Sequence, residues 1–194
     1  MIISNRDQRR LDVQLRVFEW RQVDGRDEFV RSTDIVVSPS IIQIAPGDQQ
    51  TFHVIPQIPL SATNERRYRV VLDQLPDAQG AQASAANTRV RMTVPLFAGG
   101  EAASPHSLQF SADSTMLRVT NTGQRTAKVD RLALHVPGRD PLELKPIVSF
   151  GYVFGQQTIT YALPAQYACP SRTLHLTGIV DRKPFDAQIE AECD

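Results

Sequence analysis

The chain has 194 residues, of which 41% are hydrophobic and 22% charged, a composition typical of a folded protein of one or two domains rather than of a disordered chain. Its 21 lysines and arginines balance its 21 aspartates and glutamates, so no net positive charge is available to attract nucleic acid or an anionic membrane. No segment approaches the roughly 18 consecutive apolar residues of a membrane helix, and the first residues lack the apolar core of a secretory signal. We expect no nucleic-acid partner and no membrane insertion, and we expect any export signal to lie outside this chain.

Short runs of alternating apolar and polar residues recur along the chain, separated by Pro, Gly, Asn and Asp, and this pattern predicts an all-β protein. In the first half we expect strands at 11–17, at 35–37 with 41–44, at 52–54, at 68–72 and at 90–96. In the second half we expect them at 108–110, 116–120, 127–136, 147–153, 158–161, 174–180 and 186–191.

A segment of small residues around Gly99 and Gly100, closed by Pro105, is typical of a linker. We therefore expect a first domain at 1–98, a linker at 99–105 and a second domain at 106–194. Two domains of about 100 residues, each with about seven short strands, are what a pair of immunoglobulin-like β-sandwiches requires.

An internal repeat supports two related domains. Residues 3–9 match residues 119–125 at an offset of 116, so that Asn5, Gln8, Arg9 and Val13 recur as Asn121, Gln124, Arg125 and Val129. Both copies are predicted to hold the end of one strand, a turn and the start of the next strand. The second copy follows a further strand at 105–116 that has no counterpart before Met1, so we expect the first domain to lack its first strand.

The first domain resembles the periplasmic chaperones of the chaperone-usher pilus pathway, the PapD-like family, and in particular its archaic branch that assembles fimbriae of the spore-coat-U type. The second domain matches mainly at its Asn121-Thr122-Gly123 turn. The motifs of the first domain occur in family order: Val17-Phe18-Glu19-Trp20 with Asp24-Gly25, Ile35-Val36-Val37-Ser38-Pro39, Ile44-Ala45-Pro46-Gly47-Asp48-Gln49 with Phe52-His53-Val54, Glu65-Arg66-Arg67-Tyr68-Arg69, and Val94-Pro95-Leu96-Phe97.

This resemblance implies a boomerang of two sandwiches that works in the periplasm. It implies a non-enzymatic chaperone that binds pilin subunits by donor-strand complementation and delivers them to an outer-membrane usher, without a cofactor. A strand donated to a subunit must alternate, because its apolar side chains fill a groove while its backbone completes a sheet. Packing within the chain's own sandwich is the alternative use of such a row. The predicted donor residues are Val90, Met92, Val94 and Leu96.

The family also anchors the C-terminal carboxylate of the subunit with basic residues. The position just before Leu96-Phe97, often a lysine in the better-known branches, is Pro95 here, and residues 1–98 contain 12 arginines but no lysine. An arginine must therefore bind the carboxylate, for which a guanidinium group is well suited. We predict Arg69, with Arg91 and Arg89 as alternatives; the competing interpretation for each is a solvated charge on a strand.

Other candidate residues favour structural roles. Trp20 ends an alternating strand and is expected in a core, although it could also line a ligand surface. The four histidines are scattered without the spacing of metal ligands, so we expect no metal site. Cys169 has no recognisable nucleophile signature, which argues against catalysis.

Two other classes of protein compete with the chaperone hypothesis. A structural pilus or coat subunit would carry an alternating N-terminal extension, whereas we expect this chain to start inside a strand. A carbohydrate-active β-sandwich needs paired carboxylates and exposed aromatic residues, and only 7% of the residues are aromatic.

Cys169 and Cys193 are predicted to form a disulfide, because the resemblance places the chain in an oxidising compartment and because 23 intervening residues allow the ends of two late strands to meet. A thiol titration of the unreduced, denatured protein should find no free thiol. Two free thiols would contradict the pairing and would identify both cysteines as unpaired.

Overall fold

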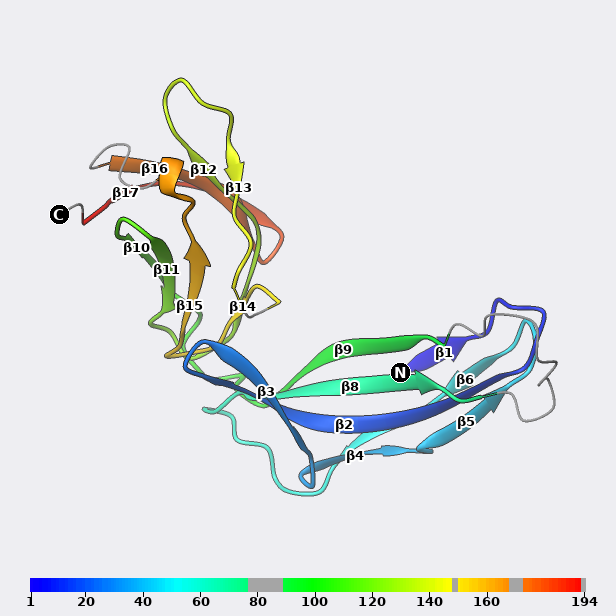
Figure 1. Cartoon of the computed structure of the whole chain (residues 1–194). Coiled ribbons are helices and arrows are strands. Elements are labelled where there is room, and N and C mark those ends of the chain that lie inside the picture. Colours follow the sequence, from blue (N-terminus) through cyan, green and yellow to red (C-terminus); the bar gives the residue numbers. More distant parts are fainter. Residues whose placement is uncertain (77–88, 148–149, 168–172, 193–194) are drawn as a thin grey trace. The chain divides into compact units, whose positions relative to one another are not determined.

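The computed structural model describes residues 1–76, 89–147, 150–167 and 173–192. The chain divides into a first unit (Met1–Arg21, Phe29–Ser61 and Arg66–Gly99) and a second unit (Gln22–Glu28, Ala62–Glu65 and Gly100–Asp194). Both are built of β-strands, which confirms the all-β prediction (Figure 1). Within the described ranges the helical content is a 3-10 turn at Ala165–Tyr167, and no helix there is long and apolar enough to cross a membrane.

The main sheet of the first unit has the strand order β3–β2–β8–β9. Its strands are β2 (Leu11–Val23), β3 (Arg26–Arg31), β8 (Arg66–Gln74) and β9 (Arg91–Ala98), and β5 (Ile41–Ile44) also pairs with the start of β2. Two shorter antiparallel pairs complete this unit: β4 (Ile35–Ser38) with β7 (His53–Pro56), and β1 (Ile2–Ser4) with β6 (Gln49–Thr51).

Alternation along β2 explains how this unit buries its core. Val13, Leu15 and Val17 point to one face and pack with Val70 of β8 and with Ile35, Ile42, Ile44 and Phe52. The intervening residues of β2 therefore lie on the opposite, outer face of the same sheet, because successive side chains of a strand point to opposite sides. The candidate binding residues lie on this outer face and on the edge strand β9.

The second unit contains two sheets. The first sheet has the strand order β10 (Leu108–Ala112), β11 (Met116–Asn121), β15 (Thr158–Ala162). The second sheet has the strand order β13 (Leu142–Glu143), β12 (Ala127–His135), β16 (Thr173–Val180), β17 (Lys183–Glu190). β14 (Tyr152–Val153) also pairs with β12. Residues of both sheets form one buried core that includes Leu117, Val119, Leu134, Ile159 and Leu176. This is the β-sandwich that the strand pattern predicts.

Two differences from the sequence prediction have clear physical reasons. β3 was not predicted, because its sequence Arg-Asp-Glu-Phe-Val-Arg does not alternate and both of its apolar residues, Phe29 and Val30, are exposed. The segment expected as a linker is a packed turn in which Ala103 is buried and the Ala102 N–H donates to the Ala62 carbonyl at 2.7 Å. Gly99 and Gly100 have φ angles of 74° and 75° there, a conformation that glycine adopts without steric cost.

The repeated asparagines have the same structural role in both units. The buried Asn5 donates from Nδ2 to the carbonyl of Arg9 at 2.7 Å and accepts at Oδ1 from the Asp7 N–H at 3.0 Å. Asn121 makes the equivalent bonds to the Arg125 carbonyl at 2.8 Å and from the Gly123 N–H at 3.0 Å. Each asparagine thus holds its turn closed from inside, which explains why the repeat is centred on it.

The two copies of the repeat differ in their strand neighbours. β11 lies between β10 and β15, whereas β1 pairs with β6 alone among the described strands. Asn121 Oδ1 also accepts from the Ser107 N–H at 3.1 Å, and Asn5 Nδ2 also donates to the Ile44 carbonyl at 3.0 Å.

Both cysteines of the predicted disulfide lie outside the described residues, so the pairing stays a prediction. The nearest described strands, β16 and β17, form an antiparallel hairpin that places Thr173 opposite Glu190. The ends of the hairpin that lead toward Cys169 and Cys193 therefore lie beside each other.

Asn121→Ala should lower the free energy of unfolding of the second unit by about 3 kcal/mol, because it removes two donated bonds and leaves the buried Gly123 N–H and the partly buried Ser107 N–H without this acceptor. Urea unfolding followed by circular dichroism measures this loss. Asn64→Ala, at an exposed asparagine, is the control and should change stability by less than about 0.5 kcal/mol. Equal unfolding midpoints for Asn121→Ala and the parent would show that the turn does not depend on this side chain.

Candidate functional site

β9 is the edge strand of the first unit's main sheet. It pairs with β8 on one side, from Arg91 opposite Asp73 to Ala98 opposite Arg66, and in the described part of the chain it has no strand on its other side (Figure 1). Pro95 lies within it, and proline inside a sheet is confined almost entirely to edge strands because it has no N–H to donate. β9 therefore presents a row of backbone groups that another strand can pair with.

The position of Pro95 identifies which backbone groups face the free edge. Because Pro95 cannot donate to its partner Arg69 on β8, its nitrogen points to the free edge, and the alternation of an antiparallel ladder places the backbone groups of Arg91, Thr93 and Phe97 on the same side. The Gln74 N–H donates to the Val90 carbonyl at 3.0 Å, which agrees with this alternation because Val90 faces β8. An added strand would meet N–H and C=O groups at Arg91 and Thr93 but only a C=O group at Pro95.

The predicted donor row differs in exposure along its length. Val90 and Met92 are 50% and 54% exposed, whereas Val94 and Leu96 are half-buried and Leu96 packs against the core of its own unit. The first two side chains are therefore available to a partner, while Leu96 already contributes to the sandwich. Internal packing, one of the two interpretations of the alternating row, therefore applies to Leu96, whereas Val90 and Met92 keep the exposed surface that donation to a partner would require.

Arg69 lies on the outer face of β8 and is buried. Only 5% of it is exposed, and the central carbon of its guanidinium group lies 3.7 Å from the centre of the Trp20 ring. Trp20 is 2% exposed and also contacts Phe29 and Phe97, with ring centres at 6.3 and 6.5 Å. Trp20 is thus buried as predicted, but within an aromatic cluster on the outer face rather than in the main core.

The two alternative arginines lie near the start of β9 and are exposed. Arg91, with 66% of its side chain exposed, and Arg89 line a shallow groove of about 540 Å³ on the outer face together with Arg16. Asp73 lies between Arg91 and Arg16 and forms an ion pair with each. Burial raises the pKa of the Asp73 carboxyl, but the hydrogen bonds from Arg91 and Arg16 outweigh this effect and hold the pKa below its ordinary value.

Sequence reasoning did not identify Arg16 or Asp73 as part of this site. Arg16 sits among the polar positions of β2, and Asp73 lies 57 residues later in the chain. The signal that could have found them is the pairing of β2 with β8, which places Arg16 opposite Val71 and next to Asp73 on the same face. Such a register follows from the fold and not from the sequence spacing.

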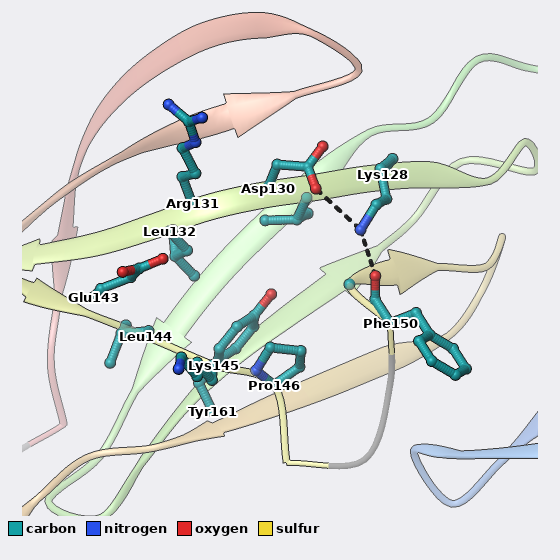
Figure 2. A pocket seen from close by; sticks show the side chains of 12 residues that line it. Lys128, Asp130, Arg131, Leu132, Glu143, Leu144, Lys145, Pro146, Phe150 and Tyr161 are labelled. Carbon is teal, nitrogen blue, oxygen red and sulfur yellow. Dashed lines mark hydrogen bonds and ion pairs between the residues drawn. The ribbon is translucent and has the colours of Figure 1, made fainter. Parts of the chain in front are cut away.

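A second hollow, of about 370 Å³, lies in the second unit, beside a bulge in β12 between Asp130 and Ala133 (Figure 2). The Lys128 ammonium, which lies 3.0 Å from the Asp130 carboxylate, also donates to the Phe150 carbonyl. Burial raises the pKa of the Tyr161 phenol, whose hydroxyl points into the hollow. Lys128, Arg131 and Lys145 line this hollow together with Asp130 and Glu143, so less of its charge is unbalanced than in the groove where three arginines face one aspartate.

Three of the four histidines make local side-chain contacts. His135 Nε2 lies 2.7 Å from the Thr177 hydroxyl, His175 Nε2 lies 2.9 Å from Asp186, and His106 Nδ1 lies 3.2 Å from Asp181. Over the described ranges, no group of three or more His, Cys, Asp or Glu side chains is arranged to hold a metal ion.

Comparisons with known proteins bear on the family and the fold of the chain. The family described as pili and flagellar-assembly chaperone, PapD N-terminal domain, matches residues 1–101 of the chain. No curated protein sequence matches the chain.

Solved structures share its fold. A chain in the chaperone–tip adhesion subunit pre-assembly complex CsuC–CsuE, from the archaic chaperone-usher Csu pili of Acinetobacter baumannii, has a TM-score of 0.71 and 23% identity, over 100% of this chain and 90% of that one. The CupB2 chaperone of Pseudomonas aeruginosa has a TM-score of 0.65 and 14% identity, over 98% and 91%. A chain of the Salmonella enterica SafA pilin–SafB chaperone complex has a TM-score of 0.63 and 16% identity, over 97% and 87%. At these identities the likeness shows the fold, a two-domain β-sandwich.

Arg69→Ala should destabilise the first unit by about 2 kcal/mol, because it removes a desolvated cation–π contact and leaves a void against Trp20. Arg69→Lys should recover only part of this loss, since an ammonium group does not stack as a planar guanidinium does. Trp20 is the single tryptophan of the chain, so its fluorescence during urea unfolding reports on this site directly. Arg31→Ala, at an exposed arginine of β3, is the control, and an unchanged midpoint for Arg69→Ala would contradict the packing role.

Proposed function

Because the chain belongs to the family of pili and flagellar-assembly chaperones, we propose that it binds pilus subunits in the periplasm by donor-strand complementation and delivers them to an outer-membrane usher. The observation that carries the proposal is the free edge of β9 with two exposed apolar side chains beside it. This function requires no catalysis and no cofactor.

The physical basis is that a pilus subunit lacking a strand exposes both an apolar groove and unpaired backbone groups. β9 offers the two things that such a groove lacks: N–H and C=O groups along its free edge, and the apolar side chains of Val90 and Met92 on one face. Both side chains are about half-exposed, so completing their burial against a subunit is worth about 1 kcal/mol each. Val94 and Leu96 would contribute less, because part of their surface is already buried in the first unit.

Binding of the subunit's C-terminal carboxylate by an arginine is the second element of the proposal. Arg69, Arg91 and Arg89 remain the candidates. A carboxylate can reach the exposed guanidinium of Arg91 directly, whereas access to Arg69 would require movement of the aromatic cluster around Trp20. Burial therefore favours the two exposed arginines over Arg69 for direct contact.

Thr93→Pro tests strand addition, because it removes an N–H group from the free edge while the ladder to β8 keeps its bonds. With the protein exported behind a signal peptide together with a pilus subunit, Thr93→Pro should capture about fivefold less subunit than the parent does, as expected for loss of a hydrogen bond worth about 1 kcal/mol. Thr93→Ala, which keeps the N–H, should capture as much subunit as the parent, and both variants should unfold at the parent's temperature. Equal capture by Thr93→Pro and the parent would rule out pairing at this edge.

A further inference from the structure

The arginine groove at the start of β9 has a charge that its own residues do not balance. Arg16, Arg89 and Arg91 line it with the single carboxylate of Asp73, and the other side chains of the described lining are neutral. Asp73 is 15% exposed and pairs with both Arg16 and Arg91, so the positive charge in excess lies on the more exposed guanidinium groups. A groove of this kind favours a ligand with negative charge.

The groove lies on the outer face of the strand whose edge is free. Arg91 and Thr93 point to this face, opposite to the face of Met92, and Val90, the residue before β9, also lines the groove. In a strand added to the free edge, every second side chain would also lie on the outer face, about 4.5–5.5 Å from its cross-strand neighbour on β9. A residue placed opposite Arg91 would therefore lie at the mouth of the groove.

Asp73 also orients the arginines. It accepts hydrogen bonds from Arg91 Nε and Arg16 Nη2, which restrains both side chains before any ligand arrives. Less side-chain entropy is then lost when a second carboxylate binds. The low pKa of Asp73 keeps it ionised and both arginines restrained throughout the neutral range.

We propose that this groove binds an acidic side chain, Asp or Glu, on the outer face of the strand that pairs with β9, and so selects the subunit sequence and its register. This inference rests on the proposed strand addition. A one-residue shift of the added strand would turn the acidic side chain to the inner face, beside Val90 and Met92, where a charge is disfavoured. The apolar face of β9 supplies affinity, and the arginine groove supplies discrimination among apolar strands.

The test uses the full chain and three nine-residue peptides that alternate valine with glutamate, glutamine or lysine, each acetylated, amidated at the C-terminus and carrying the same dye. Fluorescence anisotropy at low salt should show the glutamate peptide binding about tenfold more tightly than the lysine peptide, with glutamine between them, because cross-strand charge pairs attract in one case and repel in the other. The preference should shrink in 0.5 M salt. Arg91→Glu should reverse the preference, and Arg31→Glu, in the exposed β3 strand, should leave it unchanged.

A further arm uses the glutamine peptide with a free C-terminal carboxylate. If that carboxylate tightens binding through Arg91 while the glutamate side chains have no effect, Arg91 binds the chain terminus, as the proposed anchoring of the subunit's carboxylate expects, and the inference of an acidic side chain in the groove is overturned. Equal binding of the glutamate, glutamine and lysine peptides would overturn the proposal but leave strand addition intact. Failure of all the peptides to bind would contradict strand addition at β9, and the charge preference with it.

Discussion

An edge strand has backbone groups along one side that no neighbouring strand satisfies, and most features of the candidate site follow from β9 holding that position. Folded proteins normally protect such edges, because an exposed edge pairs readily with other chains. β9 is only weakly protected in the described part of the chain: Pro95 removes one donor, while Arg91 and Thr93 keep theirs. The exposure of Val90 and Met92 beside this edge would be a liability in a protein without a strand-pairing partner.

The two faces of β9 have different tasks because the side chains of a strand alternate. On the inner face, exposure falls from Val90 and Met92 toward Leu96, which packs into the core, so one end of the strand is anchored in the unit while the other end is presented to solvent. On the outer face, the charged groove around Arg91 lies near the presented end and the aromatic cluster around Trp20 near the anchored end. The strand is thus held at one end and available at the other.

Asn5 and Asn121 show how the two units share one design despite limited sequence similarity. Each amide bonds the backbone two and four residues further on, so the turn depends on a single side chain with a donor and an acceptor. The same Asn-centred turn therefore recurs, while the surrounding apolar residues are free to change as long as they alternate.

The sequence by itself determined the all-β class, the main strands, the repeated turn and the alternating row from Val90 to Leu96, because period-2 patterning and turn residues are local properties of the chain. It did not reveal β3, because Phe29 and Val30 are both exposed and its apolar and polar residues do not alternate. β3 is a strand because it pairs with its neighbour in the sheet. Only the tertiary structure decided the positions of the arginines. Arg69 and Arg91 occupy similar positions in alternating runs, yet β8 lies inside the sheet under Trp20 and β9 lies at its edge. Burial depends on which strands become neighbours, and the pairing of Arg16 with Asp73 across 57 residues depends on strand register, so neither can be read from local sequence.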